Sequence, residues 1–364
     1  MDTQTQIKRR NKYTWALCLT AACMMLLQGA CQRRESEDDI LSRAALIKVK
    51  IDWSRTGLDP TAKSDDANRI RRVSIRFFPK DGRPVFDMFL ETNVTEGKLL
   101  VPVGSYSVII FNESLNDNQW RGRITFSDEN NYTNFAANAV PYADTQREQQ
   151  FPFYRPRGGE RFIDEPLLLA SWNLDNFDVT EGMVLVSHGR KPTYHIPARE
   201  NNMLNAFSNV VMRPLTHRVT LTAQAENLAL MQTGYMAFQG LANKVYMASG
   251  LTSSTSATYL FTLDERTYDA NKRSGTVSSS FLSFGRFTLS GMVLRESYIL
   301  SSNVLFVTGK LYNPTSPLRF DVTGQMKSFP ASNFNIDLEI SFSLPHADEG
   351  IDVDDWGDVT DTLQ

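Results

Sequence analysis

Apolar and polar residues alternate with a period of two along most of the chain beyond residue 45. The first such segment, residues 47–53, has apolar side chains at every second position, namely Ile47, Val49, Ile51 and Trp53. The alternation is most regular over residues 336–344. Because a period of two places alternate side chains on opposite faces of an extended chain, both segments are predicted to be strands with one buried face.

Several other segments show the same alternation and are also predicted to be strands: residues 73–77, 99–111, 219–225, 304–311 and 318–322. Pro102 and Gly104 interrupt the second of these segments. Residues 80–84, Lys-Asp-Gly-Arg-Pro, predict a hairpin turn. A short helix is predicted at residues 227–231, and no long helical period follows residue 31. Many short strands separated by Gly, Pro, Asn and Ser favour an all-β fold built from β-sandwiches.

The length of the chain suggests two domains. The polar, Asn-rich stretch 198–208 is the best candidate for their boundary. We therefore expect an N-terminal β-sandwich domain over residues 45–205, a C-terminal β-sandwich domain over residues 206–346 and an acidic C-terminal tail over residues 347–364. The segment 112–165 alternates weakly, and the sequence leaves open whether it is a large loop with short strands or an elaborated sheet edge.

The first 30 residues have the pattern of an export signal. Four basic residues precede an apolar run from Tyr13 to Leu27, which is too short to span a bilayer comfortably. Gly29-Ala30-Cys31 resembles a bacterial lipobox, although Gln28 stands where a leucine is expected. The alternative Cys23 would leave a very short apolar region. We expect residues 1–30 to be a lipoprotein signal peptide and Cys31 to be the lipidation site, with an ordinary signal peptide as the simpler alternative.

Cysteine usage and charge agree with an exported protein that has no disulfide. Besides Cys31, the only cysteines are Cys18 and Cys23, and both lie in the predicted signal peptide. Residues 31–44 are hydrophilic and are predicted to be a lipidated tether. Without residues 1–30 the chain keeps 34 basic and 40 acidic residues, a net charge of −6. That balance argues against a nucleic-acid partner.

No catalytic or cofactor-binding motif stands out. The chain lacks the Gly-x-Ser-x-Gly, His-Glu-x-x-His and phosphate-loop patterns. Its four histidines, His188, His195, His217 and His346, show no metal-ligand spacing. We expect neither enzyme activity, nor a bound metal, nor a cofactor.

Two side-chain groups leave alternatives open. The acidic residues between Asp348 and Asp361 are interpreted as a solvated tail rather than a weak Ca²⁺ site, because Trp356 stands where an EF-hand would place a ligand. Trp53 and Tyr106 fall on apolar strand faces and are predicted to be core. The aromatic residues in the irregular segment either fill a small core of their own, which we favour, or stack on a sugar or a partner; they are Trp120, Tyr132, Phe135, Phe151, Phe153 and Tyr154.

Several stretches together resemble a Bacteroidales lipoprotein family of unknown function that is allied to the fimbrillin-like proteins. The first half contributes 49–53 (Val-Lys-Ile-Asp-Trp), 75–79 (Ile-Arg-Phe-Phe-Pro) before Asp81-Gly82, and 101–106 (Val-Pro-Val-Gly-Ser-Tyr) leading into 109–113. The second half contributes residues 240–242, 284–285, 320–323 and 353–356. These stretches follow the family order over nearly the whole mature chain, and the set is more specific than any one of them.

The resemblance implies two tandem transthyretin-like (Ig-like) β-sandwich domains behind a lipid anchor in the outer membrane. It favours a non-enzymatic cell-surface protein, an anchor or accessory component of a fimbrial assembly with a protein partner. The alternative is a surface lipoprotein of a nutrient-uptake system that binds a glycan or another ligand. Such family lipoproteins carry acidic residues after the cysteine as a surface-export signal, and residues 35–39 are similar to one. No catalytic residue is implied, because the matching motifs are structural.

The same resemblance supplies two further expectations. Asp361-Thr362-Leu363 is similar to an acceptor for Bacteroidales O-glycosylation, which makes Thr362 a candidate glycosylation site. In fimbrillins that polymerise, cleavage after an arginine removes the first strand, and a neighbour's strand fills its groove. Here Arg55 follows the first predicted strand, and cleavage there would also remove the tether. We expect the mature protein to keep residues 46–53 and to cap or anchor an assembly.

Overall fold

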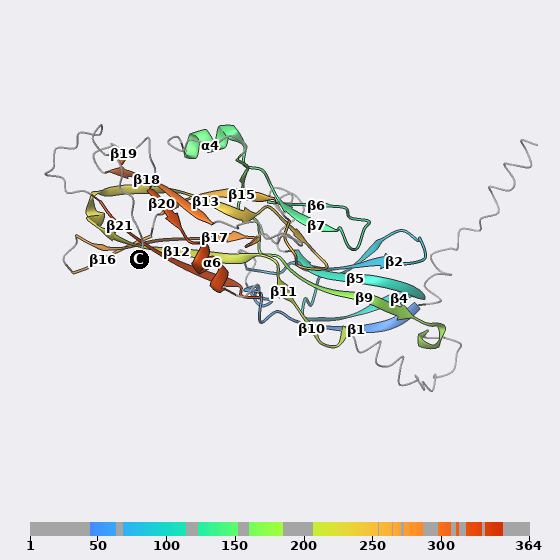
Figure 1. The fold of residues 1–364 in the computed structure, drawn as a ribbon. Coiled ribbons are helices and arrows are strands. Elements are labelled where there is room, and N and C mark those ends of the chain that lie inside the picture. Colours follow the sequence, from blue (N-terminus) through green and yellow to red (C-terminus); the bar gives the residue numbers. More distant parts are fainter. Residues whose placement is uncertain are drawn as a thin grey trace, which may run out of the picture.

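The computed structural model describes residues 44–62, 68–113, 123–151, 160–184, 207–253, 255–263, 265–270, 273–286, 298–306, 311–312, 318–329 and 332–344. Within these residues the fold is all-β, as predicted, with strands arranged along an elongated body (Figure 1). The helices described are short, α4 (Asp144–Gln150) and α6 (Thr323–Ser328) being the two α-helices. None of the helices in these ranges is long and apolar enough to cross a membrane.

The N-terminal half is a sandwich of two sheets. The smaller sheet has the order β10 (Val210–Val211), β1 (Ala44–Asp52), β4 (Glu96–Pro102). The larger has the order β11 (Arg213–Pro214), β9 (Ala170–Val179), β5 (Gly104–Glu113), β2 (Arg72–Pro79), β3 (Phe86–Leu90). Their inward side chains, such as Ile47, Ile75 and Tyr106, share one buried core. The β2–β3 hairpin turns at residues 80–84, as predicted.

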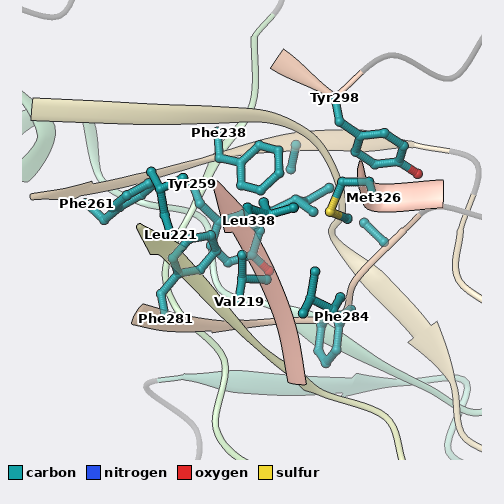
Figure 2. Close-up of a cluster of buried hydrophobic side chains, with 14 of the residues drawn as sticks. Val219, Leu221, Phe238, Tyr259, Phe261, Phe281, Phe284, Tyr298, Met326 and Leu338 are labelled. Carbon is teal, nitrogen blue, oxygen red and sulfur yellow. The ribbon is translucent and has the colours of Figure 1, made fainter. Parts of the chain in front are cut away.

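The C-terminal half pairs a four-stranded sheet with a six-stranded one. The smaller has the order β16 (Glu265–Tyr268), β17 (Gly275–Ser283), β12 (His217–Glu226), β21 (Asn335–Ser343). The larger has the order β19 (Leu311–Tyr312), β18 (Ile299–Phe306), β13 (Met231–Ala242), β15 (Ser256–Leu263), β8 (Phe162–Ile163), and β20 (Leu318–Asp321) also pairs with β18. Figure 2 shows apolar side chains from both sheets meeting between them, including Leu221 and Phe238.

The strands predicted over residues 73–77, 219–225, 318–322 and 336–344 agree with the structure, and the segment 99–111 is divided between β4 and β5. Over residues 335–343 every second side chain of β21 is buried, as its alternation requires. The single strand predicted over residues 304–311 is wrong, because β18 ends at Phe306 and pairs antiparallel with β19, which begins at Leu311. The short helix predicted at residues 227–231 is the 3₁₀ turn η3 (Leu228–Leu230), and the left-handed backbone of Asn227 starts it.

The segment 112–165 combines a sheet edge with a short helix. It contains β6 (Ile124–Ser127) and β7 (Ala136–Ala139), which join β14 (Lys244–Tyr246) in a third sheet. Phe135, just before β7, packs against Phe78 and Phe111 with ring centroids 6.1 and 5.8 Å away. The β6–β7 hairpin thus covers the outer face of the five-stranded sheet and links it to the C-terminal half.

Strands on either side of the predicted domain boundary at residue 205 pair with strands of the other half. Strand β8 precedes this residue but pairs with β15 of the C-terminal half. Strands β10 and β11 follow it but pair with β1 and β9 of the N-terminal half. The division into domains 45–205 and 206–346 stays a prediction, and the two halves exchange short strands around it.

Candidate assembly site at the first strand

Strand β1 occupies the middle of its sheet: β4 pairs with it over residues 44–50, and β10 pairs with it only at its end, at Ile51 and Asp52. It runs antiparallel to β4 from Ala44, opposite Pro102, to Lys50, opposite Glu96. On the other edge Ile51 lies opposite Val210 in the parallel strand β10. The backbone N–H of Met212 also donates to the carbonyl of Asp52 at 3.0 Å. Without β1, strands β4 and β10 would border an open groove.

The inward side chains of β1 fill that groove. Ile47, Val49 and Ile51 are at most 4% exposed and belong to the core of the N-terminal sandwich. Burying one aliphatic side chain of this size contributes roughly 1.5–3 kcal/mol to the free energy of unfolding. Because whole domains are stable by only about 5–15 kcal/mol, the strand accounts for much of this sandwich's stability.

A hydrogen-bonded turn closes the end of the strand. The Trp53 indole N–H donates to the carbonyl of Val94 at 3.0 Å and fixes the ring in the core. The backbone N–H and the hydroxyl of Thr56 both donate to the carbonyl of Trp53, at 3.0 and 2.8 Å. Leu58 N–H in turn donates to the Thr56 hydroxyl oxygen at 3.2 Å. The chain just after β1 is therefore held in one conformation.

Arg55 lies inside this turn. Its side chain is exposed, but the next residue, Thr56, is 2% exposed and its N–H is used by the turn. Proteases cut preferentially at exposed segments whose backbone can be drawn into an extended conformation. The Arg55–Thr56 bond would have to leave its turn before cleavage, so the fold protects it.

The electrostatics of the turn reinforce its geometry. The Asp52 carboxylate accepts the backbone N–H of Ser54 at 2.9 Å. That backbone hydrogen bond is the largest cause of the lowered pKa of Asp52, with smaller contributions from the Ser54 side chain and from Arg55. Asp52 is therefore ionised at neutral pH and keeps accepting this hydrogen bond.

Most of the residues singled out from the sequence lie outside the described residues. These are Cys31, Thr362, the acidic residues from Asp348 to Asp361, and His188, His195 and His346. His217 is described: its Nδ1 lies 2.6 Å from the carbonyl of Asn333, and burial lowers its pKa. Within the described part of the chain, no group of His, Cys, Asp or Glu side chains could hold a metal ion.

The described aromatic residues are core, as favoured above. Trp53 and Tyr106 are buried in the N-terminal sandwich. The Tyr106 hydroxyl donates to the carbonyl of Pro102 at 2.8 Å, across the Val103-Gly104 turn. Phe135 and Phe151 are also buried, and Tyr132 packs edge to face on Phe78. Trp120, Phe153 and Tyr154 lie outside the described residues.

These features define an all-β protein of packed sheets whose first strand is held in its own groove. A family model for a domain of unknown function, DUF5119, matches residues 30–262, and the chain belongs to this family. The expected membership of a family of unknown function is confirmed. No curated protein sequence matches the chain.

Solved structures share the fold. A candidate adhesin from Bacteroides ovatus superposes with a TM-score of 0.50 at 18% identity, over 87% of this chain and 98% of the other. The fimbrial anchor protein Mfa2 from Porphyromonas gingivalis gives a TM-score of 0.42 at 13% identity, over 84% and 92% of the two chains. At this identity, the first match establishes a common fold and leaves the function to be argued from the site.

Proposed function

We propose that this protein is a non-enzymatic cell-surface lipoprotein that anchors or caps a fimbrial or other adhesive assembly. The observation that carries the proposal is that β1 fills its own groove between β4 and β10. A subunit of a shaft built by strand addition must offer an open groove to its neighbour. A chain that keeps its own first strand in this groove after export ends an assembly instead of extending it, and the closed turn around Arg55 favours that outcome.

The position of β1 also suits an anchor. The proposed lipidation site, Cys31, precedes the first residue of the strand by a short hydrophilic segment. A force on the lipid would therefore reach the body of the protein through β1, which hydrogen-bonds to strands on both sides. Several acyl chains give stable membrane attachment, whereas a single chain gives only marginal binding.

The proposal includes the finer features expected from the sequence. Residues 1–30 are a lipoprotein signal peptide, residues 31–44 are a tether, and the protein sits on the outer membrane facing outwards. The two halves are tandem transthyretin-like sandwiches, and the partner is a protein of the assembly. The candidate adhesin from Bacteroides ovatus has the same fold, which supports a surface role.

Loss of an anchor should release the assembly that it holds. Native cells without this protein are expected to shed assembled fibres into the medium, and restoring the wild-type chain should return them to the cell fraction. The measurement is the share of fibres in cell-free medium, by electron microscopy and immunoblotting. Fibres of unchanged amount and length that stay on the deletion strain would contradict the proposal.

The proposed glycan at Thr362 has a matched control two residues away. Thr362 follows Asp361, as the acceptor pattern requires, whereas Thr360 follows Val359. The intact mass of native protein is expected to fall by a whole glycan in Thr362→Ala and only by the substitution itself in Thr360→Ala. If both variants differ from wild type by the substitution alone, Thr362 carries no glycan.

A further inference from the structure

A pocket opens at the edge of the C-terminal sandwich, far along the chain from the first strand. Its volume is about 290 Å³, close to the lower limit of small-molecule sites. Its floor is formed by Tyr259 and Phe261 of β15 and Phe281 of β17. Figure 2 shows these three rings gathered at one end of the buried cluster. The pocket therefore begins where the core ends.

Among the described residues, both sheets leave an open edge at this place. Strand β8 pairs with β15 only at Thr258 and Tyr259, so the edge of β15 beyond them lacks that neighbour. Strand β16 pairs with β17 only as far as Ser278. Thr258 donates its backbone N–H toward β8, to Arg161 at 2.8 Å. Leu260, two residues further on, directs its backbone to the same edge; the pairing of Tyr259 with Ile163 uses the N–H of Leu260, so only its carbonyl is left beside the pocket.

A serine in a core position creates the space. The inward positions of β17 alternate through Val277, Ser279, Phe281 and Ser283, and Ser279 is half-buried where a larger apolar side chain would fill the gap between the sheets. Ser279 and Ser280 both line the pocket. Ser280 is exposed, so the pocket reaches the protein surface.

Two carboxylates that follow β8 form one wall. Asp164 lies 3.3 Å from the guanidinium of Arg123, which offsets its charge. Glu165 accepts the backbone N–H of Leu282 at 2.7 Å, and burial raises its pKa. Both carboxylates therefore have partners that reduce their attraction for a cation, yet each still presents acceptor oxygens.

The α4 segment forms the rim. Tyr142, just before α4, and Phe151, just after it, meet edge to face with centroids 6.4 Å apart. Phe151 also packs edge to face on Tyr235 of β13, 6.1 Å away, which holds the rim against the sheet. Gln150 is exposed beside them and hydrogen-bonds with the Tyr142 hydroxyl. The rim thus adds aromatic surface and an amide to the pocket.

We propose that this pocket binds one ring of a neutral glycan. A pyranose ring has apolar C–H faces that pack on aromatic rings, and its equatorial hydroxyl groups both donate and accept hydrogen bonds. Tyr142, which is half-buried and is held in place by the buried Phe151, supplies the aromatic surface, and Asp164, Glu165 and the serines of β17 supply the polar partners. The acidic wall disfavours anionic sugars.

Two other ligands fit less well. A basic side chain would need a carboxylate without a cationic partner, but Asp164 is already paired with Arg123. A peptide adding as a strand would need a continuous free edge. Glu165 occupies the β17 edge at Leu282, and only a few residues of β15 remain beyond β8. The geometry therefore favours a compact ring with many hydroxyl groups.

The site is tested by saturation-transfer NMR on the intact protein. The probes are galactose, mannose, fucose and N-acetylglucosamine as neutral sugars, N-acetylneuraminic acid as an anionic sugar, and acetyl-arginine amide as a cation. At least one neutral sugar is expected to receive saturation, and the anionic sugar is not. In Tyr142→Ala the affinity for that sugar is expected to fall at least tenfold. Tyr268→Ala, on the exposed strand β16, is the matched control and should bind as wild type does.

A second variant separates a lost site from a damaged fold. Ser279→Val fills the pocket from below and should abolish binding while the circular dichroism spectrum stays unchanged. The proposal is overturned if no neutral sugar binds the folded wild-type protein at millimolar concentration. It is also overturned if binding survives both pocket variants, or if acetyl-arginine amide binds and the sugars do not. None of these outcomes bears on whether the protein anchors an assembly.

Discussion

Replacing Val49 by aspartate is expected to unfold the N-terminal sandwich. Val49 is 2% exposed and lies in the middle of β1, between the two sheets. The substitution removes roughly 1.5–3 kcal/mol of apolar burial and places a carboxylate where it has no partner, which costs several kcal/mol more. We expect a loss of at least about 4 kcal/mol in the free energy of unfolding, which belongs to the upper range for single substitutions.

Lys48 provides the matched control for this prediction. It is the preceding residue on the same strand, its side chain is exposed, and Lys48→Asp introduces the same carboxylate on the outer face. Urea unfolding should show a change within about 0.5 kcal/mol for Lys48→Asp. Trypsin should cut after Arg55 quickly in Val49→Asp and slowly in the control, because only the first variant opens the turn. Equal stability of the two variants would show that β1 is not part of the core.

Replacing Cys31 by serine is expected to abolish acylation and to move the protein from the outer-membrane fraction to the inner-membrane fraction, where the uncleaved leader holds it. The variant has no thiol to accept a diacylglycerol, so it loses acyl chains that contribute about 0.8 kcal/mol per buried methylene. Retention of the signal peptide is expected as well, because cleavage follows lipidation. The measurement is the intact mass and the distribution of the protein between the two fractions.

Cys23→Ser is the control for the lipidation site. Cys23 follows two alanines and is the other cysteine that a signal peptidase could choose. Because residue 23 lies in the signal peptide that is removed, the mature protein of this variant should have the same mass and location as the wild type. Full acylation of Cys31→Ser, or loss of acylation in Cys23→Ser, would show that Cys31 is not the lipidation site.

Strands β1, β12 and β21 were predicted because their burial is one-sided, whereas β9, β13, β15 and β17 were not predicted. In β1 and β21 buried and exposed side chains alternate almost without exception, and the sequence shows this as alternating apolar and polar residues. Strand β5 could be placed only roughly, because it is buried on both faces over Tyr106–Asn112 and so has little alternation to detect. Its outer face is covered by the β6–β7 hairpin, within a segment that the sequence left undecided.

The partners of each strand were not predictable from local patterns. Strand β21 pairs in parallel with β12, more than a hundred residues earlier in the chain. Strand β10 is two residues long and leaves no periodic signal, yet it closes one side of the groove around β1. Such short or distant pairings depend on the tertiary fold, because any exposed edge with a matching face could accept them.

Of the candidate sites, the aromatic core residues could be predicted from the sequence and the pocket could not. The interpretation of Trp53 and Tyr106 as core residues is confirmed because each lies on a regular apolar face. The pocket at the edge of the C-terminal sandwich was not apparent in the sequence, because its parts come from β15, β17, the α4 segment and the two residues after β8. The one available signal was Ser279 at an apolar position of an alternating strand, and serine is too common in strands of this chain to single out.

The N-terminus of the protein in native outer membranes tests the central claim most directly. If the protein anchors or caps an assembly, the major species begins at an acylated Cys31, keeps residues 46–53 and runs as a single band. Mass spectrometry of the terminal peptide and electrophoresis without boiling supply both facts. A major species that begins at Thr56 and forms a ladder of stable multimers would contradict the account, because it would make this protein a subunit of the shaft.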